Sequence, residues 1–174
     1  RRVLFRSGAL FELGRYDASL AAYGNAAELG PRLAEARHGL GKTLAKLERY
    51  PQALAAYDEA LRLRPGSAES ITGRAHVLTE LKRFDEAVRG YEKAIAINPD
   101  LAFAWHGLAN SLVELERFDE ARLAYERALK IDPHFAGAWN GIAMLHWAAD
   151  RHEEALAAYD KAIELEPDNA GVRF

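Results

Sequence analysis

The sequence predicts an all-α protein built from repeated pairs of antiparallel helices. Prolines and tyrosines each recur every 34 residues along the chain, and small or aliphatic residues form further series with the same period. The prolines are Pro31, Pro65, Pro99, Pro133 and Pro167, and the tyrosines are Tyr23, Tyr57, Tyr91, Tyr125 and Tyr159. A fixed period of this length is typical of a solenoid, in which each repeat is one supersecondary unit.

Within one period, residues 102–135, apolar residues follow one another at three- and four-residue steps in two separate runs. The first run is Trp105, Leu108, Leu112 and Leu115, and the second is Ala121, Tyr125, Ala128 and Ile131. This spacing predicts two amphipathic helices joined by a short turn at residues 116–119. The proline that closes each period is expected to end the second helix.

Small residues recur on both expected helices, where they let the two backbones approach closely. On the first helix they are Gly41, Ala75, Ala109 and Ala143, and on the second they are Ala53, Ala87, Ala121 and Ala155. The large tyrosine of each period is expected to fill the space beside them.

The pattern Trp105-x-x-Leu108-Ala109-x-x-Leu112, followed by Ala121-x-x-x-Tyr125-x-x-Ala128 and Pro133, resembles the tetratricopeptide repeat. The resemblance covers the chain from residue 8 onward. It implies helix pairs stacked into a right-handed superhelical solenoid, with the first helix of each pair lining a concave groove where peptides bind. Arg37, Arg74 and His146 depart from the pattern because they stand where apolar residues are expected.

The repeat frame divides the chain into segments, of which the first and the last are incomplete. Residues 1–7, Arg-Arg-Val-Leu-Phe-Arg-Ser, resemble the translation of a common sequencing-library adapter, so we expect a non-native segment there. The expected divisions are 1–7 as that segment, 8–33 as a partial repeat 1, 34–67, 68–101, 102–135 and 136–169 as repeats 2 to 5, and 170–174 as the start of a truncated repeat 6.

Composition argues against several classes of function. The formal charge is -3, with 23 basic and 26 acidic residues interspersed, so nucleic acid is a poor candidate partner. The absence of cysteine excludes disulfides, thiolate metal sites and cysteine nucleophiles. No apolar run approaches the length of roughly 18 residues that a membrane span needs. No group of residues suggests a nucleophile or a general base, so neither an enzyme nor a cofactor is predicted.

Two columns of ionisable residues allow both a functional and a structural interpretation. His38, His76 and His106 fall on the expected groove face, where they could form a metal or pH-sensitive site or simply hydrogen-bond a ligand. A basic column at the turn between the helices could form a stripe for an acidic partner, or serve locally at a helix end beside acids such as Asp85 and Asp119. Its members are Arg15, Arg49, Arg83, Arg117 and Arg151.

The resemblance assigns the groove to particular positions of each first helix. Among these positions, the candidate binding residues are His38, Lys42, Thr72, His76, Phe103, His106, Asn110, Asn140, Met144 and Trp147. Some relatives grip a peptide carboxylate with a Lys/Asn/Arg clamp, but Gly141 stands where that clamp would place asparagine. We expect Phe103, Met144 and Trp147 to anchor a ligand, with Asn110 and Asn140 pairing its backbone amide through both donor and acceptor.

The sequence therefore predicts a scaffold that binds a protein or an extended peptide. One alternative is the substrate-selecting arm of a larger enzyme such as a glycosyltransferase, with its catalytic domain outside this chain. Another is a structural module that self-associates end to end through uncapped repeats.

Overall fold

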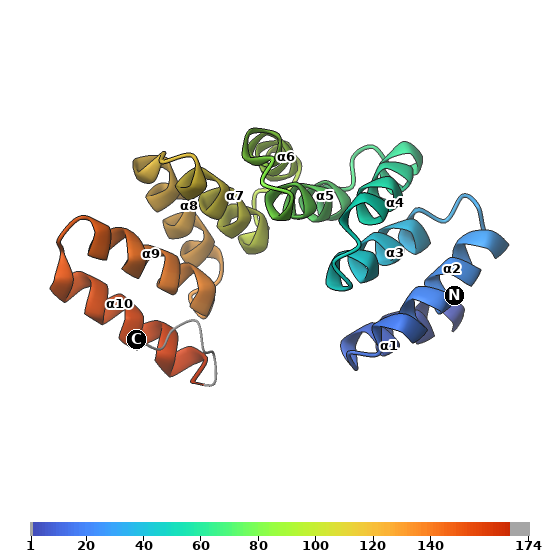
Figure 1. Ribbon diagram of the computed structural model, residues 1–174, viewed down its shortest axis with the longest axis horizontal. Helices are drawn as coiled ribbons and strands as arrows, with labels where there is room; N and C mark the ends of the chain where they lie inside the picture. Colours follow the sequence, from blue (N-terminus) through green and yellow to red (C-terminus); the bar gives the residue numbers. More distant parts are fainter. Residues whose placement is uncertain (1, 168–174) are drawn as a thin grey trace. The chain divides into compact units, whose positions relative to one another are not determined.

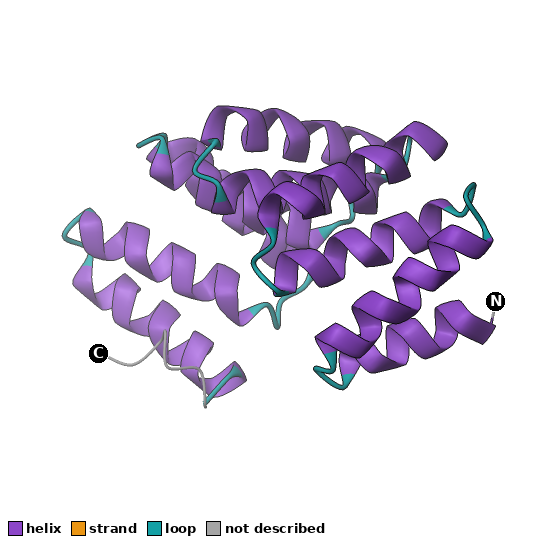
Figure 2. Ribbon diagram, turned by 45° about the vertical axis from the view of Figure 1, so that its right-hand side comes forward, coloured by secondary structure: helices purple, strands orange, loops and turns teal. Residues whose placement is uncertain are grey.

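The computed structural model describes residues 2–167, and every regular element in that range is a helix (Figures 1 and 2). The helices are α1 (Arg2–Glu12), α2 (Tyr16–Leu29), α3 (Ala34–Lys46), α4 (Tyr50–Leu63), α5 (Ala68–Glu80), α6 (Phe84–Ile97), α7 (Ala102–Glu114), α8 (Phe118–Ile131), α9 (Ala136–Ala148) and α10 (His152–Leu165). The all-α fold class is confirmed. The chain divides into an N-terminal body, α1 to α6, and a C-terminal body, α7 to α10.

Within residues 2–167 consecutive helices pack in pairs, α1 with α2 through α9 with α10, and the first helix of the first pair is slightly short. The helix α1 has 11 residues, whereas α3, α5, α7 and α9 have 13 each. It includes residues 2–7, and Ser7 is fully buried with its carbonyl accepting a hydrogen bond from the Ser19 hydroxyl. The non-native origin of residues 1–7 stays a prediction, and the expected start of a sixth repeat at 170–174 lies outside the described residues.

The prolines lie where the period predicts. Each of the five stands two residues beyond the last residue of a second helix, for example Pro65 after Leu63 and Pro133 after Ile131. A proline so placed cannot continue the helix because it has no N–H to donate. The one proline outside the period, Pro51, occupies the first turn of α4, where the missing N–H costs nothing.

The turn inside every helix pair has the same hydrogen-bonded geometry. After α3, the Glu48 amide donates to the Ala45 carbonyl and the Arg49 amide donates to the Leu44 carbonyl. These two bonds define a Schellman motif, which requires a left-handed residue at the position of Glu48. The left-handed residues of the five turns are Gly14, Glu48, Lys82, Glu116 and Asp150.

Only the first of these turns has glycine, the residue that adopts a positive φ without strain. We expect Glu116→Gly to raise the free energy of unfolding by about 0.5–1 kcal/mol, and Gly14→Ala to lower it by about 1 kcal/mol. A Cβ on Gly14 meets no atom within 4 Å, so its effect comes from the backbone alone. Chemical denaturation measures both changes in the free energy of unfolding. Equal effects of the same sign would contradict a left-handed conformation at these two positions.

The buried interior consists of alanines packed around tyrosine rings. Ala53, Ala87, Ala121 and Ala155 of the second helices are all fully buried, as are Ala75, Ala109 and Ala143 of the first helices. The Tyr57 ring lies between Gly41 of α3 and Gly73 of α5. A Cβ added at Gly41 would stand 3.0 Å from the ring, and one added at Gly73 would stand 2.5 Å from it. Gly39 approaches Tyr23 and Gly141 approaches Tyr125 in the same way.

Two members of the arginine column, Arg83 and Arg117, bind an acid of the helix that follows. Arg83 makes two hydrogen bonds to the Glu86 carboxylate at 2.7 and 2.8 Å, and Arg117 makes the equivalent pair to Glu120 at 2.7 Å each. The acid is therefore three residues along the chain, rather than the Asp85 or Asp119 expected from sequence. One turn of helix brings the third residue back beneath the guanidinium, whereas the second points away from it.

Candidate functional site

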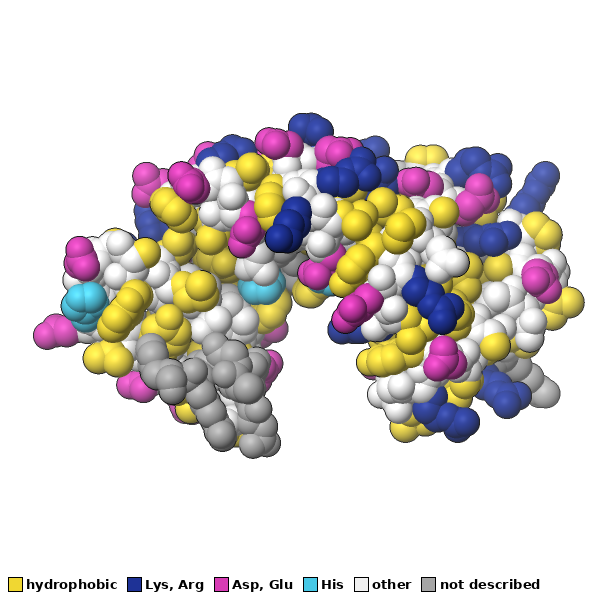
Figure 3. Space-filling model, in the orientation of Figure 1, with side chains coloured by type: hydrophobic (Ala, Val, Ile, Leu, Met, Phe, Trp, Pro, Cys, Tyr) yellow, Lys and Arg dark blue, Asp and Glu magenta, His cyan; other side chains and the backbone are white. Residues whose placement is uncertain are grey.

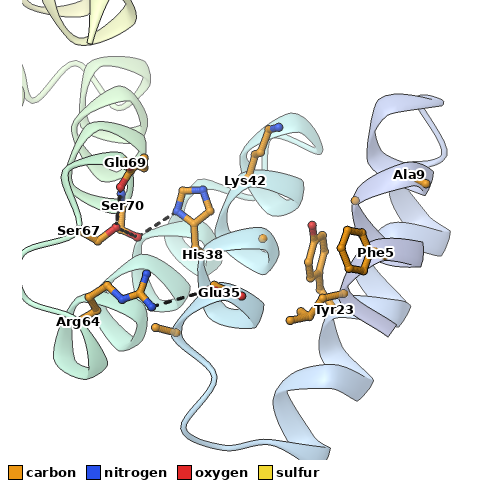
Figure 4. Close-up of a pocket in the computed structure, with 14 residues that line it drawn as sticks. Phe5, Ala9, Tyr23, Glu35, His38, Lys42, Arg64, Ser67, Glu69 and Ser70 are labelled. Atoms are coloured by element: carbon orange, nitrogen blue, oxygen red, sulfur yellow. Dashed lines mark hydrogen bonds and ion pairs between the residues drawn. The ribbon is translucent and has the colours of Figure 1, made fainter. Parts of the chain in front are cut away.

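A cavity of about 810 Å³ opens in the N-terminal body between α1, α3 and the start of α5 (Figure 4). The lining residues are Leu4, Phe5, Gly8, Ala9, Tyr23, Ala34, Glu35, His38, Gly39, Lys42, Arg64, Ser67, Glu69 and Ser70. Two of the predicted binding residues, His38 and Lys42, are among them. One wall includes Leu4 and Phe5 of segment 1–7, and the opposite wall is formed by residues 34–70, from α3 to the start of α5.

His38 is the most constrained polar group of this cavity. Its Nδ1 lies 3.0 Å from the Ser70 hydroxyl, and its ring stands edge-on to the Tyr57 ring with centroids 5.6 Å apart. The bond to Ser70 occupies Nδ1 and leaves only Nε2 for a ligand. Burial lowers the pKa of His38, and the nearby Lys42 lowers it further against the opposing charge of Glu69. The imidazole is therefore neutral at pH 7.

Charged groups of both signs surround the imidazole. The Lys42 ammonium lies 3.3 Å from the Glu12 carboxylate and 4.0 Å from the centre of the Phe11 ring. On the other side, Arg64 approaches Glu35 at 3.8 Å (Figure 4). These pairs are exposed and hold their partners weakly, so both cations are accessible to a ligand that enters the cavity.

Serines shape the far wall, where α5 begins. Ser67 is the N-cap of α5, and its hydroxyl oxygen accepts a hydrogen bond from the Ser70 amide at 3.2 Å. Serine favours this position because its oxygen satisfies an amide that has no partner within the helix. The cap fixes the place at which α5 starts, and so holds the Ser70 hydroxyl within reach of His38.

The lowered pKa of His38 makes stability depend on pH. Because the unfolded chain takes up the proton first, the free energy of unfolding should fall as pH drops from the ordinary value of 6.5 through the lowered pKa. We expect His38→Gln to lose less stability than the wild type between pH 7 and pH 5. Thermal melts at both pH values measure this difference, and equal losses in the two proteins would contradict a neutral, half-buried His38.

The other predicted residues of the N-terminal body differ in accessibility. His76 is half-buried on α5, where burial lowers its pKa against the nearby charge of Glu80. Thr72 is only 6% exposed, and its hydroxyl donates to the Ala68 carbonyl at 2.8 Å. Its side chain is thus directed into its own helix, which sequence spacing alone did not indicate.

In the C-terminal body, α7 presents Phe103, His106 and Asn110. Phe103 is 50% exposed. The His106 ring lies 4.7 Å from the Phe135 ring and 5.8 Å from the Tyr125 ring. Asn110 accepts a hydrogen bond of 2.6 Å from the Tyr125 hydroxyl through Oδ1. That bond fixes the orientation of the amide, with Oδ1 toward Tyr125 and Nδ2 on the other side.

The neighbouring helix α9 presents Asn140, Met144 and Trp147. Met144 and Trp147 are 54% and 50% exposed. The Trp147 ring lies 4.7 Å from the His152 ring at the turn into α10. Asn140 places Nδ2 4.0 Å from the Met144 sulfur, while its Oδ1 is buried without a hydrogen-bond partner. Asn140 therefore also presents its donor side to the surface.

Acidic and basic side chains are interspersed on the face visible in Figure 3. Within residues 2–167, no group of three or more histidine, aspartate or glutamate side chains is placed to hold a metal ion. In the same range, every helix is too short or too polar to span a bilayer.

Comparison with protein-family models decides what kind of repeat this is. One model described as tetratricopeptide repeat matches residues 8–68 and 106–170, and a second with the same description matches residues 67–133. The chain belongs to the tetratricopeptide repeat family. Repeats of this family generally serve as non-catalytic scaffolds that bind proteins or peptides. No curated protein sequence matches the chain.

Several solved structures share this tetratricopeptide fold. The chain is 24% identical to TTC0263 of Thermus thermophilus, with a TM-score of 0.86 over 99% of this chain and 94% of that one. It is 18% identical to pilF of Pseudomonas aeruginosa, with a TM-score of 0.88 over 98% of this chain and 78% of that one. YrrB, described as a tetratricopeptide protein with an unusual peptide-binding site, is 24% identical with a TM-score of 0.70, over 98% and 88% of the two chains.

The cavity also contains residues that the tetratricopeptide frame did not select. Arg64, Ser67 and Ser70 lie at the junction of α4 and α5, outside the positions that the resemblance assigns to the groove. One local signal was available, because a serine immediately before a helical run, such as Ser67, is typical of a helix N-cap. The contact between Ser70 and His38 joins different repeats and could not be read from spacing.

Proposed function

We propose that this tetratricopeptide chain is a non-catalytic scaffold that binds an extended peptide segment of a partner protein against the faces of its first helices. The observation that carries the proposal is the cavity between α1, α3 and the start of α5. Its volume, about 810 Å³, lies in the usual range of ligand sites. The peptide-binding site described for YrrB supports the same class of ligand.

The mixed apolar and polar lining suits a peptide, which carries both kinds of group. Apolar side chains such as Phe5 line one side of the cavity, and hydroxyls, an imidazole and charges of both signs line the other. A peptide backbone supplies a donor and an acceptor at every residue, and therefore matches such a lining along its length. Nε2 of His38 and the Lys42 ammonium are the two groups best placed to meet it.

Selection from a library of displayed random dodecapeptides on the immobilised chain tests the proposal. We expect enriched peptides to bind the wild type and to lose about tenfold in affinity with Lys42→Ala or with His38→Ala, since each removes hydrogen bonds or charge at the cavity. Fluorescence anisotropy with the synthetic peptides measures the loss.

The matched control is Lys93→Ala on α6, a second helix of the same body, where the side chain is exposed. It should leave the affinity unchanged. Peptides that lose affinity with Lys93→Ala, but bind normally to every first-helix variant in both bodies, would show that the binding surface is on the second helices.

A further inference from the structure

The outer side of α10, the last described helix, repeats a surface of α4. Its residues, which we call the end face, are Leu156, Tyr159, Asp160 and Ile163. They stand three periods after Leu54, Tyr57, Asp58 and Leu61 of α4. Steps of three and four residues place such a set on one side of a helix.

The two surfaces differ in what covers them. On α4, the next helix α5 packs over the surface, so that Leu54 is half-buried and Tyr57 is only 3% exposed. On α10, Leu156 is 51% exposed, Ile163 is exposed and Tyr159 is half-buried. Apolar side chains gathered in this way on a surface favour a partner that removes them from water.

The contacts between α5 and α4 show what such a partner needs. α5 brings the backbone of Gly73 against the Tyr57 ring, where an added Cβ would stand only 2.5 Å from the ring. The next residue, Arg74, donates from Nε to the Asp58 carboxylate at 2.6 Å. A glycine followed by a cation therefore matches a tyrosine followed by an acid, and α10 has the same tyrosine and acid in sequence.

The apolar contact follows one helical turn later on α5. Val77, four residues after Gly73, belongs to the buried cluster against which Leu54 packs. Leu156 offers the same leucine on α10. The helix that fits the end face thus has an apolar side chain four residues after its glycine.

The acid of the end face has no intrahelical cation at the place where α8 has one. On α8, Glu126 stands at the position of Asp160 and is paired with Arg122, one turn earlier, at 2.6 Å. Leu156 occupies the position of Arg122 on α10. The covering helix is then the source of a cation for Asp160, as α5 is for the acid of α4.

We propose that the end face binds an amphipathic helix of a partner protein, in which glycine is followed directly by arginine or lysine and then, three positions later, by an apolar residue. The glycine lies against Tyr159, the cation pairs with Asp160 and the apolar side chain packs on Leu156. The site is on a second helix of the C-terminal body, so it is additional to the N-terminal cavity and does not rest on the proposed function.

The charge of α10 also favours a basic partner over a second copy of this chain. α10 has four acidic residues and one basic residue, Lys161, which pairs with Glu164 at 2.6 Å, whereas α8 has three of each. Two copies of α10 would therefore repel each other. The helix α1 of a second copy fits poorly too, because Phe5 stands one period before Gly39, at the place of the glycine.

A helical peptide with the sequence of α5 and its two cap residues, 67–81, is a defined probe for the end face. It already has Gly73, Arg74 and Val77 in the required order. A lactam bridge between positions 75 and 79 holds it as a helix, and these positions face α6 rather than α4 in the protein. We expect the fluorescein-labelled probe to bind the wild-type chain by anisotropy.

Variants of the chain and of the probe test each contact. Leu156→Arg should lower the affinity at least about tenfold, and Gly73→Leu in the probe should do the same, because the ring leaves no space for a side chain. Asp160→Asn should lower it about threefold, as expected for an exposed ion pair. The matched control is Glu126→Gln on α8, the same position under α9, which should leave the affinity unchanged.

Exchanging the two charges identifies the ion pair. Asp160→Lys should weaken the probe more than Asp160→Asn does, because two cations then meet. A probe with Arg74→Glu should bind the wild type weakly and should recover affinity on Asp160→Lys. No recovery would overturn the pairing of Asp160 with the cation, since a general attraction to an acidic helix shows no such reversal.

Three further results would overturn the inference. One is equal affinity of the probe for the wild type and for Leu156→Arg, when circular dichroism shows both to be folded. Another is a dimer in sedimentation velocity that Leu156→Arg converts to a monomer, because the end face would then bind a second copy. The last is a tenfold gain in probe affinity on deletion of residues 168–174, because the chain itself would then cover the face. None of these results affects the library peptides expected at Lys42.

Discussion

Replacing Tyr57 with alanine should lower the free energy of unfolding by about 3–5 kcal/mol, the largest effect expected from a single substitution here. The ring is only 3% exposed and packs in a cluster with Leu44, Ala56 and Val77. The backbones at Gly41 and Gly73 flank it closely, and two helices cannot easily collapse into the vacated space. Urea denaturation followed by circular dichroism measures the loss.

The control for this substitution is Phe118→Ala. Phe118 is also an aromatic residue in a helix, but it is 51% exposed. Its removal leaves no closed cavity, so the cost should be about 1 kcal/mol or less. If Tyr57→Ala were no more costly than Phe118→Ala, Tyr57 would not be the central packing residue of its repeat.

Adding a single methyl group at Gly73 should have the second largest effect, a loss of about 1–3 kcal/mol. The new Cβ would stand 2.5 Å from the Cζ and hydroxyl oxygen of Tyr57, well inside contact distance. Either the ring or α5 has to shift, and both are held by neighbours. Denaturation of Gly73→Ala alongside the wild type gives the cost.

Gly24→Ala is the matched control for Gly73→Ala, and its expected effect on stability has the opposite sign. Gly24 lies within α2, and a Cβ there meets no atom within 4 Å. Because alanine favours a helix over glycine, this variant should gain about 0.5–1 kcal/mol. A loss at Gly24 comparable to that at Gly73 would show that contact with Tyr57 is not the reason for the cost at Gly73.

Most of the fold could be predicted because it depends on periodicity. The prolines after Leu63 and Ile131 mark helix ends, and the steps between Trp105, Leu108 and Leu112 mark a helix face. Such signals are local, and five copies reinforce one another. The turns were harder, because Glu48, Lys82, Glu116 and Asp150 adopt a conformation for which glycine is the usual signal.

The candidate site could be predicted less fully because it depends on contacts between repeats. Position within the repeat selected His38 and Lys42, which do line the cavity. It gave no indication that Ser70 would meet His38 or that the Tyr125 hydroxyl would orient Asn110. It also placed Thr72 on the groove face, whereas its side chain is buried. Each of these depends on which atoms meet in space.

The close fit of tyrosine against glycine has a consequence for how such a gene can change. The glycines that receive the rings, Gly39, Gly73 and Gly141, share one place in the repeat, as do Tyr23, Tyr57 and Tyr125. Every junction of this kind therefore accepts the same neighbour. Unequal recombination that gains or loses a whole repeat brings a tyrosine and a glycine from these same repeat positions together at the new junction. A crossover out of phase would instead place a tyrosine ring against a residue that has a side chain. The number of repeats in the array can therefore change by whole repeats while the tyrosine–glycine packing at each junction stays the same.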